Sequence, residues 1–114
     1  MKVYGIKTCG SVKKALTYFK AKGIEHTFVD LKQTPVDKQT IETWLAKVPM
    51  DKLFNNKGTK YRTLGLAKEP LTDAQKLDWL AKENLLIKRP VVELDNGGVL
   101  VAFDEGIYDQ TFGG

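Results

Sequence analysis

The residue best suited to chemistry in this chain is its single cysteine, Cys9. It follows a run typical of a β-strand, residues 2–6, and precedes apolar residues at helical spacing, so we expect it at the start of a helix. Unpaired backbone N–H groups and the positive end of the helix dipole favour an anion there. Lys7, Lys13 and Lys14 add positive charge nearby. Cysteines in such settings reach pKa values of about 3.5 to 7.5, so we predict a reactive thiolate.

The alternative is that Cys9 is a small, buried and inert residue, as free cysteines often are. Its neighbours Thr8, Gly10 and Ser11 suit an open loop better than a core, which favours the reactive interpretation. One cysteine forms no internal disulfide and no multi-cysteine metal site, so a second sulfur must come from another molecule. His26 lies far along the chain from any second candidate ligand, and we predict no metal site.

Arg89 and Pro90 form the second candidate feature. A proline that opens a strand opposite a strand-loop-helix is a place where a cis peptide can hold the backbone toward a bound thiol. Arg89 would then lie near Cys9, although an ordinary surface arginine before an edge strand fits the same spacing. Lys57, in a turn that contains glycine, is a weaker candidate, because a solvated turn lysine is the simpler interpretation.

The elements around Cys9 have the pattern of a β-α-β unit. Apolar residues recur at i, i+3, i+4 and i+7 from Val12 to Phe19, which predicts an amphipathic helix that ends at Gly23. Residues 26–31 predict the second strand. A crossover helix of this kind joins two parallel strands.

The middle of the chain, at about residues 34–85, is predicted to be a helical insert. Thr34 and Pro35 offer a cap and a first-turn proline for one helix. Thr72 and Gln75 have the spacing of a capping box for a later helix.

The last part of the chain predicts two strands and a helix. The strands, at residues 91–94 and 99–103, are joined by a turn rich in Asn and Gly, which is typical of a β-hairpin. Asp104 can cap a last helix that carries Ile107 and Phe112. The order β-α-β, helical insert, β-β-α predicts an α/β, thioredoxin-like fold with a mixed four-stranded sheet, in a single domain over the whole chain.

The length and composition of the chain limit its number of domains and the kinds of partner it can bind. A chain of 114 residues, 42% of them hydrophobic, is long enough for one compact domain. The net charge of +4 comes from scattered basic residues, which favours anionic ligands but not direct nucleic-acid binding. We find neither a signal peptide nor a run of about 20 apolar residues. We therefore expect a cytoplasmic protein with no membrane association.

Five segments occur in order along nearly the whole chain: Tyr4-Gly5-Ile6-Lys7-x-Cys9, Lys13-Lys14-Ala15, Asn55-x-Lys57-Gly58-Thr59, Ile87-Lys88-Arg89-Pro90 and Val101-x-Phe103. Together they resemble the arsenate reductase, Spx and YffB family, most closely its YffB-like branch. Proteins of that branch look like glutathione-dependent thiol reductases of unsettled substrate. The resemblance therefore implies a monothiol oxidoreductase with no bound cofactor, which uses glutathione or another small thiol as co-substrate. It also implies a monomer, with glutaredoxin as an optional protein partner.

The resemblance also implies roles for individual residues. Cys9 matches the nucleophilic cysteine of the family, and Arg89 matches the arginine of its Arg-Pro motif. The expected substrate-binding residues are Lys7, Gly10, Lys57 and Pro90. Lys57 stands where the YffB and Spx branches usually have arginine, which keeps the charge but weakens bidentate oxyanion binding.

Two departures from the family pattern limit what the resemblance implies. Arsenate reductases use two further arginines, and Asn55 and Ala102 stand at those places, so we expect no efficient arsenate reduction. Spx proteins bind RNA polymerase and sense oxidation through C-x-x-C, whereas the second cysteine is replaced here by Val12. The alternative function is thus a regulator that binds RNA polymerase without this redox switch.

Overall fold

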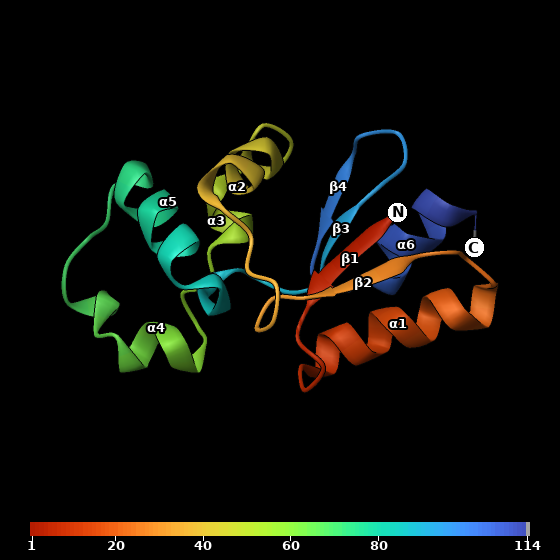
Figure 1. The fold of residues 1–114 in the computed structure, drawn as a ribbon, viewed down its shortest axis with the longest axis horizontal. Helices are drawn as coiled ribbons and strands as arrows, with labels where there is room; N and C mark the ends of the chain where they lie inside the picture. Colours follow the sequence, from red (N-terminus) through yellow and green to blue (C-terminus); the bar gives the residue numbers. More distant parts are fainter. Residues whose placement is uncertain (114) are drawn as a thin grey trace.

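The computed structural model describes residues 1–113, which include a mixed four-stranded sheet in the order β2-β1-β3-β4 (Figure 1). Strand β1 (Lys2–Gly5) pairs in parallel with β2 (Thr27–Asp30). On its other side β1 pairs antiparallel with β3 (Val91–Glu93), which pairs antiparallel with β4 (Val99–Val101). The predicted mixed sheet and its strand order in the sequence are confirmed.

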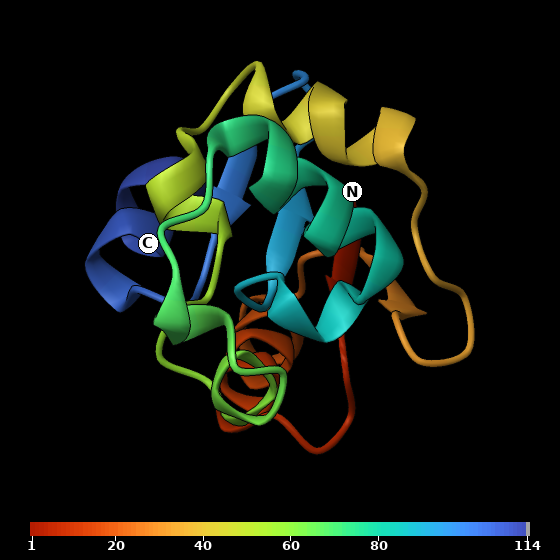
Figure 2. The same cartoon turned by 90° about the vertical axis from the view of Figure 1, so that its left-hand side faces the viewer.

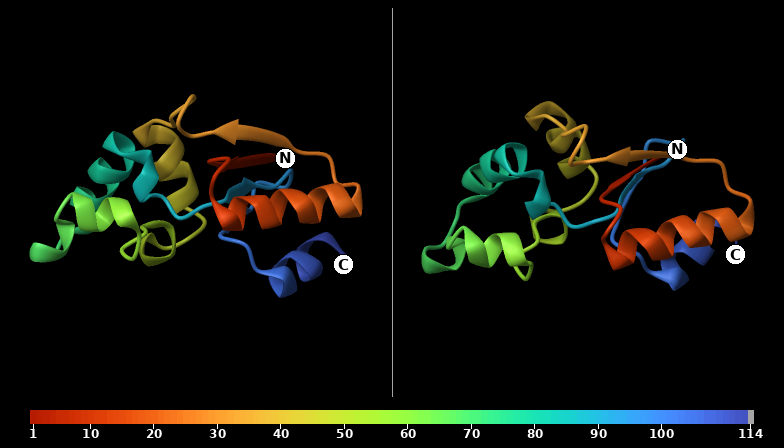
Figure 3. Two further views of the ribbon diagram at one scale, coloured as in Figure 1. Left: turned by 90° about the horizontal axis from the view of Figure 1, so that it is seen from below. Right: turned by 60° about the horizontal axis from the view of Figure 1, so that its bottom comes forward.

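One face of the sheet is covered by α1 (Gly10–Lys22) and α6 (Glu105–Phe112), which lie side by side (Figures 1 and 3). Helix α1 ends at Gly23, which has a φ of 67° in the left-handed region, as its sequence predicts. Successive residues of a strand point to opposite faces, so Val3 and Val92 face these helices. We call the buried residues on this face the α1-side cluster: Val3, Ala15, Tyr18, Phe19, Val92 and Tyr108.

The residues between β2 and β3 form helices beside the other face of the sheet, which Figure 2 shows from the front. They are α2 (Lys38–Leu45), α3 (Met50–Leu53), α4 (Thr59–Thr63) and α5 (Asp73–Lys82), with 3-10 turns η1 (Leu66–Lys68) and η2 (Asn84–Leu86). Their apolar side chains meet Tyr4 and Val91 of the sheet. We call the buried residues here the insert-side cluster: Tyr4, Ile6, Leu31, Ile41, Trp44, Leu53, Phe54, Leu66, Leu80, Leu86, Ile87 and Val91.

The predicted start of the first insert helix at Thr34 is wrong, because α2 begins at Lys38. Asp37 is its N-cap and accepts a hydrogen bond from the Thr40 N–H at 2.9 Å. The Thr34 N–H instead donates to the Asp30 carbonyl at 2.7 Å, within the turn that follows β2. A tertiary contact holds the intervening residues, since the Val36 N–H donates to the Asn84 side chain at 2.7 Å.

Two other caps follow the sequence prediction. Thr72 and Gln75 form the reciprocal capping box of α5, with both hydrogen bonds present. Asp104 caps α6 by accepting from the Ile107 N–H at 3.0 Å. On α6 the core residue is Tyr108, which is fully buried, whereas the Ile107 residue is 48% exposed. No helix within residues 1–113 has the length and apolar character needed to cross a membrane.

Candidate functional site

Cys9 is the N-cap residue of α1, directly after the loop that leaves β1. Its carbonyl accepts from the Lys13 N–H at 3.0 Å, and its own N–H donates to the Ile6 carbonyl at 3.2 Å. The strand and the helix approach each other closely here, since a Cβ on Gly5 would lie 2.5 Å from a methyl group of Val12. The half-buried Cys9 is thus held at the helix N-terminus, as predicted from the sequence.

The environment of Cys9 lowers its pKa below the ordinary value of a thiol. Partial burial is the largest single influence and acts in the opposite direction, by raising the pKa. It is outweighed by the backbone N–H groups of Val12 and Ser11 together with the hydrogen-bonding capacity and charge of Arg89. The Cys9 side chain makes no capping hydrogen bond in this structure. The backbone N–H groups and Arg89 lower the pKa because they stabilise the charged thiolate more than the neutral thiol.

Arg89 lies between η2 and β3 in the chain. Its Nη1 donates to the Leu85 carbonyl at 2.9 Å, which fixes one end of the guanidinium. The Arg89 Nε is buried and has no hydrogen-bond partner among residues 1–113, so a donor remains for an anion. The peptide bond between Arg89 and Pro90 is cis, and the buried Pro90 accepts from the Ala102 N–H at 2.8 Å.

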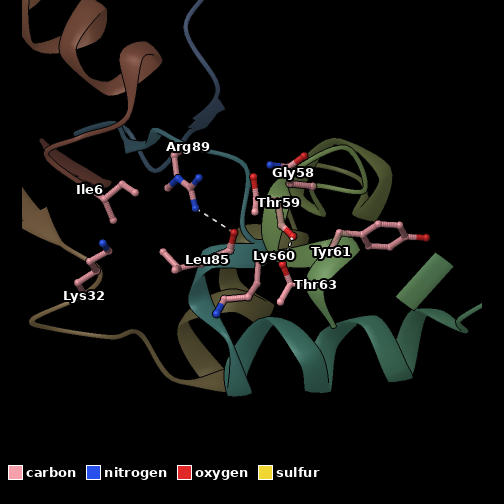
Figure 4. A pocket seen from close by; sticks show the side chains of 10 residues that line it. Ile6, Lys32, Gly58, Thr59, Lys60, Tyr61, Thr63, Leu85 and Arg89 are labelled. Carbon is pink, nitrogen blue, oxygen red and sulfur yellow. Dashed lines mark hydrogen bonds between the residues drawn. The ribbon is translucent and has the colours of Figure 1, made fainter. Parts of the chain in front are cut away.

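A cavity of about 310 Å³ adjoins Arg89, between the loops that leave β1 and β2 and the segment that contains α4 (Figure 4). Figure 4 shows Ile6 and Lys32 on one side and the residues of α4 on the other, with Arg89 and Leu85 between them. The lining residues are Ile6, Lys32, Asn55, Gly58, Thr59, Lys60, Tyr61, Thr63, Leu85 and Arg89.

The structure brings together some of the residues singled out from the sequence. Arg89 lies close enough to Cys9 to lower its pKa, and Pro90 is adjacent to Arg89, while Gly10 is the first residue of α1. Lys7 and Lys57 are exposed and do not line the cavity. The backbone of Lys57 is tied into its turn, because its N–H donates to Asn55 and its carbonyl accepts from Arg62.

Sequence reasoning missed two lysines, Lys32 and Lys60, which line the cavity. Lys32 lies just beyond the end of β2, the strand that pairs in parallel with β1. The carboxyl ends of parallel strands lie at the same edge of a sheet, so its position two residues beyond Asp30 carried a usable signal. Lys60 had no comparable signal, because the short helix α4 owes its place to tertiary contacts.

A sequence model of the ArsC family matches residues 4–111. The chain belongs to the ArsC family. The match includes Cys9, Arg89 and every lining residue of the cavity. It agrees with the family resemblance stated from the sequence motifs, and the family has the thioredoxin-like fold predicted above.

Relatives of this ArsC-family chain cover nearly all of it. An uncharacterized protein of Haemophilus influenzae is 35% identical over 111 residues, with 96% of both chains covered. An arsenate reductase of Escherichia coli is 28% identical over 109 residues, which cover 94% of this chain and 77% of the relative.

Solved structures give the same assignment. The YFFB (PA3664) protein superposes with a TM-score of 0.88 at 32% identity, covering 96% of both chains. An arsenate reductase (ArsC) related protein from Brucella melitensis, also 32% identical, has a TM-score of 0.74 and covers 97% of this chain and 92% of its own. At the level of the family, the activity is that of a thiol-dependent reductase.

Proposed function

We propose that the protein is a glutathione-dependent monothiol oxidoreductase in which Cys9 is the nucleophile. The observation that carries the proposal is the position of Cys9, at the N-terminus of α1 beside Arg89, where its pKa is lowered. Thiolate is the reactive form of cysteine, so a lowered pKa increases the fraction that can react near neutral pH.

The reaction proceeds by two thiol–disulfide exchanges. With a mixed disulfide of glutathione and a substrate thiol, the Cys9 thiolate attacks the glutathione sulfur, and the substrate leaves as a thiolate that takes a proton from water. A second glutathione, as its thiolate, then attacks the sulfur of the glutathione bound to Cys9. Oxidised glutathione leaves and the Cys9 thiolate is restored, so each turnover consumes one glutathione thiol and releases one substrate thiol, while the two glutathione sulfurs leave joined in one disulfide.

Arg89 serves this chemistry by stabilising negative charge. Its guanidinium lowers the pKa of Cys9, and its unpartnered Nε can donate to the thiolate that leaves in each exchange. We assign Lys57 a weaker role as a second cation, since it is exposed and outside the cavity lining, while Asn55 and Gly58 of the same turn line the cavity.

We further propose that this protein reduces arsenate poorly. Asn55 and Ala102, which stand where arsenate reductases have arginine, both adjoin the Arg89-Pro90 segment: Asn55 lines the same cavity, and Ala102 donates to the Pro90 carbonyl. Each missing charge-assisted hydrogen bond forfeits about 1.5 to 3 kcal/mol of oxyanion binding. With glutathione and glutaredoxin supplied, we expect arsenate reduction to rise when both positions are changed to Arg. Wild-type turnover equal to that of an arsenate reductase would contradict this proposal.

A turnover assay with a glutathionylated peptide tests the main proposal, with formation of oxidised glutathione measured through glutathione reductase. We expect Cys9→Ser to abolish turnover and Arg89→Gln to lower kcat/KM by about 10- to 100-fold, the value of a hydrogen bond to a charged group. Lys47→Gln is the control for loss of a positive charge, since Lys47 is exposed and does not line the cavity. Turnover that survives Cys9→Ser would overturn the proposal.

The same variants address the alternative of a regulator that binds RNA polymerase. A pull-down from lysate compares the wild-type protein with Cys9→Ala. An equally strong polymerase band in both, together with no thiol turnover, would favour the regulator. A mixed disulfide with glutathione that requires Cys9 would favour the reductase.

A further inference from the structure

The charged side chains that line the cavity beside Arg89 are all positive. Three cationic side chains line it, from Lys32, Lys60 and Arg89, and within residues 1–113 no Asp or Glu lines it. Its volume of about 310 Å³ lies at the lower limit for small-molecule sites. The cavity therefore suits a small anionic molecule and not a folded protein surface.

The three cationic side chains have different surroundings. The Arg89 guanidinium donates to the Leu85 carbonyl and lowers the pKa of Cys9. Lys32 and Lys60 enter from opposite sides of the cavity, as Figure 4 shows. They can bind two separate anionic groups of one ligand, while Arg89 stabilises the Cys9 thiolate.

Lys60 already has an anionic neighbour, Glu83, which does not line the cavity. The Lys60 Nζ lies 3.7 Å from the Glu83 Oε2, and the two side chains are 34% and 31% exposed. Ion pairs of this kind are weak, so Lys60 can exchange Glu83 for a ligand carboxylate at little cost. The other oxygen of Glu83 accepts from the Leu85 N–H at 3.4 Å, which keeps the carboxylate in place during such an exchange.

We propose that this cavity binds the body of the thiol co-substrate and selects dicarboxylate thiols, with Lys32 and Lys60 each holding one carboxylate and Glu83 competing for Lys60. The inference rests on the proposed function, because it assigns the substrate class of the same site. Glutathione, with a carboxylate at each end, belongs to this class, and its diethyl ester has the same sulfur and peptide without the two charges.

The single cysteine allows a direct test. Cys9 is first converted to its mixed disulfide with 2-thiopyridine. An added thiol then attacks the Cys9 sulfur, the new S–S bond forms, and pyridine-2-thione leaves and is measured by its absorbance. The readout is the ratio of the rate constant for glutathione to that for its diethyl ester, each expressed per thiolate so that their different thiol pKa values cancel.

We expect the ratio to exceed one in the wild-type protein. Lys32→Gln and Lys60→Gln should each lower it by up to about fivefold, the limit for a solvent-accessible ion pair. Glu83→Gln should raise the ratio, because Gln keeps an oxygen for the Leu85 N–H but no longer competes for Lys60. Lys47→Gln is the control for a change in net charge, since Lys47 is exposed and lies outside the cavity lining.

Two results would overturn the inference while the proposed function stands: equal rates for the acid and the ester in the wild type, or a ratio that the cavity lysines change no more than Lys47→Gln does. A lower ratio in Glu83→Gln would overturn the competition assigned to Glu83. If neither thiol releases pyridine-2-thione, the proposed function itself fails, and the inference with it.

Discussion

The two hydrophobic clusters on either side of the sheet are held together in different ways. The α1-side cluster is dominated by stacked and edge-on aromatic rings, with Phe19 in contact with Tyr18, Tyr108 and Phe112 at centroid distances of 5.3 to 5.9 Å. The hydroxyls of Tyr18 and Tyr108 reach its margin, where they donate to Asp109 and to the Ala102 carbonyl.

In the insert-side cluster, side-chain hydrogen bonds join elements that lie far apart in the sequence. Glu93 of β3 accepts from the Trp44 Nε1 at 2.7 Å and from the Tyr4 hydroxyl at 2.9 Å, which joins α2 to two strands. Burial first, and then the hydrogen bond to Glu93 and its charge, raise the pKa of Tyr4 to about 12, so the hydroxyl stays a donor. The buried Asn84 joins the α2 entry segment to α5 through the Val36 backbone and the Leu80 carbonyl.

The two halves of the site, Cys9 and the Arg89 cavity, therefore depend on different kinds of packing. The nucleophile is positioned by close apolar packing of α1 on the sheet, which depends on side-chain volume. Arg89 and the cavity belong to the segment whose apolar packing is supplemented by hydrogen bonds of fixed geometry. Variants that change volume and variants that change only hydrogen bonds should therefore affect the two sides differently.

The largest expected effect is on the α1 side. Phe19→Ala removes a fully buried ring and should lower the free energy of unfolding by about 3 to 5 kcal/mol. Phe19→Leu keeps most of the apolar volume and should cost clearly less. Urea unfolding followed by circular dichroism measures both, and equal losses would show that volume is not what holds this side.

The next effect tests the side-chain hydrogen bonds of the insert side. Trp44→Phe keeps an aromatic ring but removes the donor to Glu93, and we expect a loss of about 1.5 to 3 kcal/mol, typical of a bond to a charged group. Tyr4→Phe removes the other donor to the same carboxylate. In a double-mutant cycle by urea unfolding the two losses should be non-additive, and strict additivity would refute the shared network.

A smaller effect is expected where β1 meets α1. Gly5→Ala would place a Cβ 2.5 Å from Val12, and overpacking of this kind costs about 1 to 3 kcal/mol. At Gly10 an added Cβ meets nothing within 4 Å, and Ala favours a helix over Gly, so Gly10→Ala should be neutral or stabilising. Thermal unfolding measures the stability of the two variants. A Gly5→Ala variant as stable as Gly10→Ala would contradict the close approach of β1 to Val12 of α1.

Local chemistry explains what the sequence could predict. The four strands, the helix start at Cys9, the Thr72–Gln75 box and the Asp104 cap all depend on residues near one another in the chain. The juxtaposition of Arg89 with Cys9 was also open to prediction, but through the family resemblance, because spacing alone fitted an ordinary surface arginine equally well.

Tertiary contacts explain the remainder. Asp37 replaces Thr34 as the cap of α2 because the residues before it are tied to Asn84, which lies 48 residues away from Val36. The cavity lysines Lys32 and Lys60 come together only once the insert has docked on the sheet. The sequence offers Asp37 as a possible cap and Lys32 as a residue near the end of a strand, but it does not show the contacts that select Asp37 or bring Lys60 beside Lys32.

The central claim is that the α1 N-terminus and Arg89 together lower the pKa of Cys9 and so increase its thiolate fraction. The most direct measurement is the rate of Cys9 alkylation by iodoacetamide as a function of pH, in the wild type and in Arg89→Gln. Because the folded protein lowers the pKa of Cys9, the rate should reach its plateau at a lower pH than a free thiol, whose pKa is about 8.5. Arg89→Gln should move the midpoint to higher pH, whereas a wild-type midpoint at or above about 8.5, or one that Arg89→Gln leaves in place, would contradict the account.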